Sequence, residues 1–188
     1  GCPAISEDGK IVMDASLCMD AMAEAARLHI PVLAHCEDRN MVQKGVINEG
    51  EKSKEFGLPG IKNTVEDLII ARDIILAKET GAQLHLCHCS TKNSVWMVKS
   101  AKEVGVKVSA EVRPHHITLT TDDMKEPDPN YKMNPPLRTK EDVQALKEGL
   151  GKGIWEVFPP VMRPKPLVEK TAPCRGPHSA LWDLRRRP

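Results

Sequence analysis

Short apolar runs that end in polar residues recur along the chain. They lie at residues 30–38 (IPVLAHCED), 82–90 (AQLHLCHCS) and 106–116 (VKVSAEVRPHH). A short continuous apolar run of this kind is typical of a strand that is buried on both faces, as in a parallel sheet. The pattern therefore predicts three buried strands, each with polar side chains at its carboxyl end.

Segments with helical periodicity lie before, between and after these runs. Each begins with a residue that caps helices well: Asp14, Thr64, Thr91 and Thr139. In the first segment the period of 3.6 predicts an apolar stripe made of Leu17, Ala21, Met22, Ala25 and Leu28. Strands that alternate with helices predict an α/β fold with a parallel sheet.

Three further segments lack either periodicity. Residues 39–63 and 117–138 are polar connections longer than most loops in α/β domains. Both follow the carboxyl ends of predicted strands, where the active sites of α/β enzymes lie, so we expect them to be functional. Residues 154–188 are rich in proline and arginine, and their composition predicts a disordered tail.

Composition narrows the range of functions. The 188 residues carry 27 Lys and Arg against 26 Asp and Glu, a net charge of +1, so no basic surface predicts binding to nucleic acid. No apolar run reaches the roughly 20 residues that cross a bilayer, and no secretory leader opens the chain, so we expect no membrane association. The six cysteines are scattered and form no C-x-x-C pair. They predict free thiols in a reducing cytoplasm.

The sequence HLCHCST, residues 85–91, is the densest group of chemically active side chains. Side chains alternate along a strand, so His88 shares a face with Leu84 and Leu86, and His85 lies on the other face. If His88 faces the interior of a barrel it can be a metal ligand, and His85 then packs among the helices. His35 occupies the matching place at the end of the preceding strand.

Other polar residues allow two interpretations each. Glu37 and Asp38 either join a site or cap the next segment, and Asp8 is either a ligand or a turn residue before Gly9. In NPPLR, residues 134–138, the loop is either merely stiff or a substrate clamp in which Arg138 binds a carboxylate. The roles of the two histidines of PHH, residues 114–116, stay open.

Taken together and in order, SEDG, AHCED, LHLCHCST, EVRPHHITLT and YKMNPPLRTKED resemble the bacterial-type dihydroorotases of the amidohydrolase superfamily. The resemblance extends over about residues 4–153. It implies a partial (β/α)8 TIM-type barrel of the metal-dependent hydrolase kind, incomplete at both ends, with one or two zinc ions at its mouth. It also implies a cytoplasmic enzyme, compatible with a homo-oligomer of the full-length protein.

The resemblance further implies the roles of single residues. Asp8, His35 and His88 match metal ligands of the family, and Asn134 matches an asparagine that contacts the substrate. The implied reaction interconverts N-carbamoyl-L-aspartate and dihydroorotate in pyrimidine biosynthesis. Zinc would activate a water molecule and polarise the amide carbonyl, and a carboxylate would move the proton.

Two motifs of the family do not occur in this sequence: the early His-x-His pair of ligands and the late motif that carries the catalytic Asp. We therefore expect an inactive internal fragment, with a partial barrel at residues 1–153 and a tail at 154–188 that is disordered or the product of a shifted reading frame. Two alternatives stay open. One is a non-catalytic scaffold or subunit related to dihydroorotase, and the other is a cyclic amidase resembling hydantoinase or allantoinase.

Overall fold

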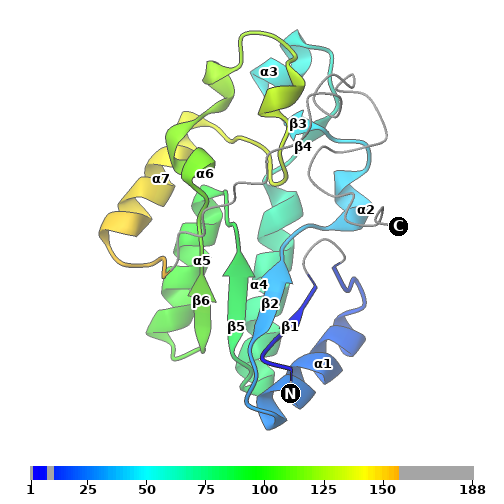
Figure 1. Cartoon of the computed structure of the whole chain (residues 1–188), viewed down its shortest axis with the longest axis vertical. Helices are drawn as coiled ribbons and strands as arrows, with labels where there is room; N and C mark the ends of the chain where they lie inside the picture. Colours follow the sequence, from blue (N-terminus) through cyan, green and yellow to red (C-terminus); the bar gives the residue numbers. More distant parts are fainter. Residues whose placement is uncertain (1, 8–10, 157–188) are drawn as a thin grey trace.

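The computed structural model describes residues 2–7 and 11–156. Its central sheet consists of four parallel strands in the order β1-β2-β5-β6 (Figure 1). The strands are β1 (Ile5–Ser6), β2 (Val32–His35), β5 (Leu84–Cys87) and β6 (Val108–Ala110). The prediction of an α/β protein with a parallel sheet is thus confirmed. Helical connections make this arrangement possible, since strands that are joined through helices can run in one direction.

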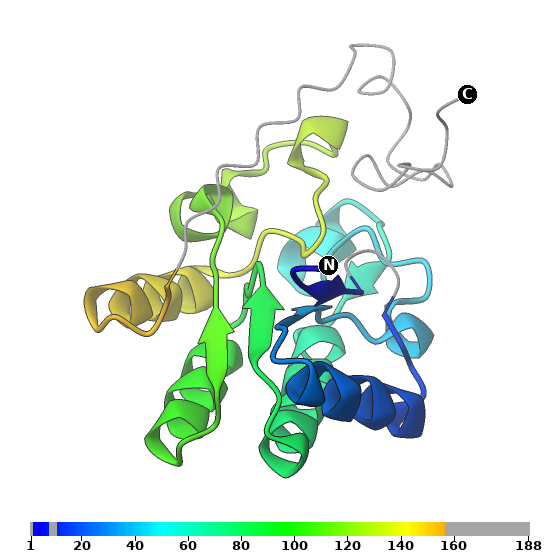
Figure 2. The same ribbon diagram turned by 60° about the horizontal axis from the view of Figure 1, so that its bottom comes forward.

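Helices α1 (Ala15–Arg27), α4 (Thr64–Thr80), α5 (Lys92–Glu103) and α7 (Lys140–Gly151) lie along one side of this sheet (Figure 2). Their starts follow the predicted caps in three cases. The side chains of Asp14, Thr91 and Thr139 each accept a hydrogen bond from a backbone N–H of the first turn. At α4 the cap position falls on Asn63 instead, one residue before the predicted Thr64.

The two long connections contain short elements that the sequence did not predict. Between β2 and α4 lie α2 (Arg39–Val42), α3 (Glu51–Glu55) and a small parallel ladder of β3 (Ile47–Asn48) with β4 (Gly60–Ile61). The strand predicted at 106–116 ends at Ala110, and α6 (Pro114–Thr118) follows it. Proline at the first position of a helix costs no hydrogen bond, so Pro114 favours a helix start there. Two short 3-10 helices, η1 (Thr121–Asp123) and η2 (Pro129–Tyr131), follow in the second connection.

The main core fills the space between the sheet and the helices. Leu84 and Leu86 of β5 are fully buried against this layer. The stripe predicted on α1 is partly wrong, because Leu17 and Leu28 are exposed and the buried residues are Cys18, Met22 and Ala25. This stripe begins one position later and keeps the i, i+4, i+7 spacing of a helix face.

The folded part continues past the predicted boundary at Gly153. Ile154 and Trp155 are buried in the main core, and the Trp155 indole N–H donates to the Leu146 carbonyl at 3.0 Å. The Glu156 amide donates to the Ala110 carbonyl of β6 at 3.1 Å. The prediction for the remainder of the tail falls on residues 157–188, which lie outside the described residues.

The opposite face of the sheet differs in its burial. Leu33, His85 and Ser109 project from it and are only half-buried, whereas their neighbours Ala34, Leu86 and Ala110 on the helix side are fully buried. Within residues 2–7 and 11–156, the long helices cover the other side (Figure 2). Within the described residues, this face of the sheet is therefore less well covered than the face that packs against the helices.

Two expectations from composition can be compared with the structure. Cys2, Cys18, Cys36, Cys87 and Cys89 are free thiols, as predicted, and Cys174 lies outside the described residues. Among the described residues, no helix combines the length and the apolar character needed to span a membrane.

A first prediction concerns the capping box of α7, in which Thr139 and Asp142 exchange hydrogen bonds. Thr139→Ala removes the oxygen that accepts the Asp142 amide, so we expect the free energy of unfolding to fall by about 1 kcal/mol. Urea unfolding followed by circular dichroism measures it. Thr64→Ala is the matched control, because Thr64 is an exposed threonine inside the first turn of α4; an equal loss in both variants would contradict the prediction.

Candidate functional site

Two histidines meet at the carboxyl ends of neighbouring strands. His35 is the last residue of β2, and His88 follows the last residue of β5. The His35 Nδ1 and His88 Nε2 atoms lie 2.9 Å apart, and both residues are buried. Parallel strands bring their carboxyl ends to one edge of the sheet, so two segments 53 positions apart in the chain converge there. The expected convergence of these two side chains is present.

The backbone at His88 explains how its side chain reaches this point. His88 has φ of 41°, in the left-handed region that non-glycine residues seldom adopt. Its N–H donates to Glu111 Oε1 at 3.2 Å, and the Cys89 N–H donates to the Glu111 backbone carbonyl at 2.9 Å. These bonds stabilise a turn immediately after the strand.

This turn overturns the prediction for His85. His85 does not pack among the helices but projects from the same face as Leu33, where its Nδ1 contacts Ser109 Oγ at 2.8 Å and its Nε2 contacts Glu111 Oε2 at 3.3 Å. The alternation of strand faces fails because His88 has left the extended conformation. Burial raises the pKa of Glu111, but the hydrogen bond from His85 and the charge of Arg113 outweigh it and hold this pKa below its usual value.

The edge of the sheet where His35 and His88 meet is the polar edge, and Glu37 and Asn134 add further polar groups to it beside His35. The Asn134 side-chain amide donates to the Glu37 carboxylate, whose Oε2 lies 3.9 Å from His35 Nε2. Burial raises the pKa of Glu37, and the hydrogen bond from Asn134 offsets part of this effect. Of the two acids considered as caps, only Asp38 caps α2, through the amides of Asn40 and Met41.

His116 supports the loop that carries Asn134. Its Nε2 lies 3.0 Å from the Pro135 carbonyl, an acceptor, so this nitrogen carries the proton. Burial lowers the pKa of His116 well below its ordinary value, and the neighbouring His115 adds to the effect. The ring is therefore neutral and holds the backbone directly after Asn134.

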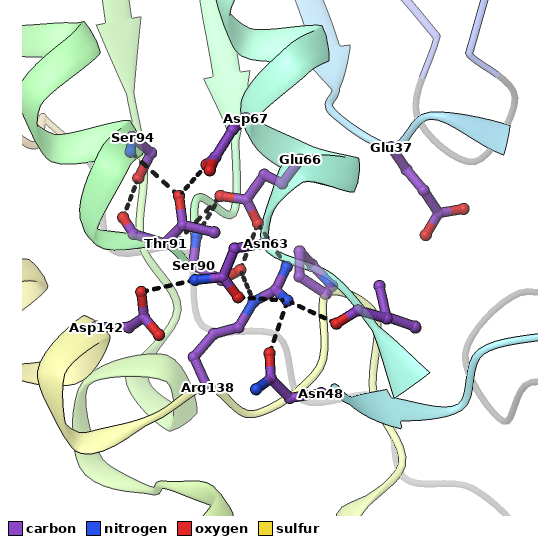
Figure 3. A network of polar contacts seen from close by, with 12 residues as sticks. Glu37, Asn48, Asn63, Glu66, Asp67, Ser90, Thr91, Ser94, Arg138 and Asp142 are labelled. Atoms are coloured by element: carbon purple, nitrogen blue, oxygen red, sulfur yellow. Dashed lines mark hydrogen bonds and ion pairs between the residues drawn. The ribbon is translucent and has the colours of Figure 1, made fainter. Parts of the chain in front are cut away.

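Arg138 is not a substrate clamp, and that interpretation is wrong. Its side chain is 2% exposed, and its guanidinium donates to groups of the protein itself (Figure 3). The carboxylate that it meets is that of Glu66, at 3.4 Å. Further acceptors are Ser90 Oγ, Asn48 Oδ1, Asn63 Oδ1 and the Ile61 carbonyl. Each of the three guanidinium nitrogens therefore has a partner within the protein.

Two of the described side chains, His35 and His88, carry donor atoms of a kind that metal ions bind. Two imidazoles with nitrogens facing each other fit the donors that zinc prefers. In a tetrahedral site with Zn–N bonds of about 2.0–2.1 Å, two ligand nitrogens lie about 3.3 Å apart, so the observed 2.9 Å requires only a small separation of the rings. Within residues 2–7 and 11–156 no group of three His, Cys, Asp or Glu side chains could hold a metal ion. The predicted third ligand, Asp8, lies outside the described residues.

Comparison with known sequences identifies relatives of the chain. Residues 1–94 match the family described as dihydro-orotase-like. The chain is 45% identical over 170 residues to a dihydroorotase of Staphylococcus epidermidis and 46% identical over 170 residues to one of Bacillus cereus, and each alignment covers 90% of this chain. The chain spans about 40% of the length of these curated relatives. Because the aligned 170 residues outnumber residues 1–153, the similarity continues past Gly153.

Solved structures show the same fold at lower identity. A D-hydantoinase from a Thermus species has a TM-score of 0.62 at 24% identity, covering 78% of this chain and 33% of that one. An L-hydantoinase from Arthrobacter aurescens has a TM-score of 0.65 at 24% identity, covering 83% of this chain and 36% of that one. These likenesses support the fold alone. The family match over half of the sequence, together with the polar edge formed by His35 and His88, leads to one conclusion: the chain belongs to the dihydroorotase-like family.

Proposed function

We propose that this chain is part of a zinc-dependent cyclic amidohydrolase that interconverts N-carbamoyl-L-aspartate and dihydroorotate. The observation that carries the proposal is the 2.9 Å approach of His35 Nδ1 and His88 Nε2 at the strand ends. The curated relatives at 45–46% identity are dihydroorotases, which favours this substrate over hydantoin. The half-buried face at Leu33, His85 and Ser109 supports a sheet that forms part of a (β/α)8 barrel wall in the whole enzyme.

In this proposal His35, His88 and Asp8 hold one or two zinc ions. When bound, zinc supplies a polarising charge and an activated water molecule. Glu37 and Asn134 act from the side of β2, where the Asn134 amide would bind the substrate and donates to the Glu37 carboxylate, whose pKa burial raises. The neutral His116 orients Asn134 through the Pro135 carbonyl.

The whole enzyme would interconvert N-carbamoyl-L-aspartate and dihydroorotate in the cytoplasm. It would bind no nucleic acid, and the proposal is compatible with a homo-oligomer. The division into a partial barrel and a tail stays a prediction, with residues 154–156 joined to the folded part, as does the lack of turnover by the isolated chain. No motif in the sequence supplies the catalytic Asp that the family resemblance implies.

Zinc titration of the purified chain tests the proposal. We expect zinc to shift the ring signals of His35 and His88 in heteronuclear NMR, and His88→Ala to weaken binding roughly 100-fold through the loss of one ligand. His29→Asn is the matched control: His29 is exposed, and asparagine tolerates its left-handed backbone, φ 56°. Ring signals of the wild type that do not respond to zinc would overturn the proposal.

A further inference from the structure

A buried carboxylate holds the turn that follows β5. Glu66, in the first turn of α4, accepts hydrogen bonds from the amides of Ser90 at 2.8 Å and Thr91 at 3.2 Å, both at Oε1. Its Oε2 accepts the Ser90 hydroxyl (Figure 3). On the other side, Glu111 accepts the amide of His88. Two carboxylates from different elements thus fix the turn 88–91, which carries His88 in a left-handed conformation.

Arg138 ties this turn to the loop 134–138. Its Nε donates to Ser90 Oγ at 3.0 Å, and its Nη2 lies 3.4 Å from Glu66 Oε2. Its Nη1 reaches Asn48 of β3 at 2.9 Å and Asn63 at 3.1 Å. The guanidinium therefore joins the end of β5, the start of α4, the β3–β4 ladder and the loop that begins with Asn134 (Figure 3).

Stability alone does not account for a pair of this kind. The side chains of Arg138 and Glu66 are 2% and 3% exposed, so both charges have lost their hydration. A buried ion pair often stabilises no more than well-packed apolar side chains of similar volume do. The guanidinium differs from such side chains in its planar fork of donors, which fixes the relative orientation of every group that it contacts.

We propose that Arg138 and Glu66 are positioning residues that lock the turn 88–91 to the loop 134–138. This inference rests on the proposed function, because it assigns His88 to the metal and Asn134 to the substrate. The pair holds the two sides of the site in one register: Glu66 sets the turn that carries His88, and Arg138 sets the loop that carries Asn134. A metal ion held by the histidines and a substrate held by Asn134 would then keep a constant relative position.

The test uses the metal-free full chain with Arg138→Lys, which keeps the charge and removes the fork. We expect amide hydrogen exchange at Ser90 and Thr91 to accelerate about tenfold relative to Ala25 in α1, the effect of losing about one hydrogen bond. The ring signals of His35 and His88 should shift as well. Glu66→Gln, which keeps the shape and one acceptor oxygen, should give the same local pattern and replaces the first variant if that one does not fold.

Met22→Ala is the control for a purely structural effect, because it opens a cavity in the main core. It should accelerate exchange in all core amides alike and leave the histidine ring signals in place. The proposal is overturned if Arg138→Lys gives the pattern of Met22→Ala, or leaves both readouts as in the wild type. These measurements need no metal, so their failure is distinct from a failure of zinc to reach the histidines.

Discussion

Arg138→Met is expected to lower the free energy of unfolding by about 3–5 kcal/mol, because it leaves the buried Glu66 carboxylate without its cation. The buried Ser90 and Asn48 and the half-buried Asn63 also lose a donor to their acceptor oxygens. Urea unfolding followed by circular dichroism measures the loss. Addition of Glu66→Met to this variant should recover part of the stability, since the double variant contains no unpaired buried charge.

A surface pair provides the matched control for this result. Lys140 Nζ lies 2.9 Å from Asp122 Oδ2, but the two side chains are 76% and 56% exposed. Lys140→Met should therefore change stability by less than about 1 kcal/mol. A loss on Arg138→Met no greater than that on Lys140→Met would show that the network in Figure 3 bears no appreciable part of the stability.

The sequence predicted those parts of the site that depend on local pattern. His35 and His88 each follow an apolar run, and strand periodicity alone places them at one edge of a parallel sheet. The helix starts at Asp14, Thr91 and Thr139 follow from the same kind of local chemistry, a side-chain oxygen before an apolar period.

What the sequence did not predict depends on contacts between distant segments. The error at His85 came from a single backbone angle at His88, which is held in place by hydrogen bonds that the His88 and Cys89 amides donate to the distant Glu111. The interpretation of Arg138 as a substrate clamp stayed open because nothing local pairs it with Glu66, which lies 72 positions away in the chain. One feature of the sequence pointed to a different role for Glu37. One acid is sufficient to cap a short helix, so when Asp38 caps α2 the adjacent Glu37 is not needed as a cap.

The ladder of β3 and β4 escaped prediction for a different reason. Each strand has two residues, too few for a period of two to become visible, and Gly60 in β4 weakens the strand signal. Trp155 lies in a segment rich in proline and charge, yet it packs against α7. The average composition of residues 154–188 gave no indication of this packing contact at the beginning of the segment.

The second large effect concerns the pH dependence of stability in the metal-free chain, where a half-buried acid and a half-buried histidine oppose each other. Burial raises the pKa of Glu7 from 4.5 to about 7, and burial lowers the pKa of His115 from 6.5 to about 4. Between pH 4.5 and 7 the folded state binds the Glu7 proton that the unfolded state releases, so stability falls as pH rises. Between pH 4 and 6.5 the unfolded state binds the His115 proton that the folded state rejects, so stability rises with pH.

Each effect amounts to at most about 3.5 kcal/mol at 1.4 kcal/mol per pKa unit, and less after solvent screening of these partly exposed groups; the two oppose each other between pH 4.5 and 6.5. Two substitutions should therefore reveal opposite slopes. Glu7→Gln removes the acid and should make the free energy of unfolding rise with pH from 4 to 6.5, and His115→Gln should make it fall from pH 4.5 to 7. Urea unfolding at half-unit pH intervals with a chelator present measures both slopes against the flatter wild type. Parallel curves for the three proteins would contradict the prediction, because a group whose pKa folding leaves unchanged adds no slope.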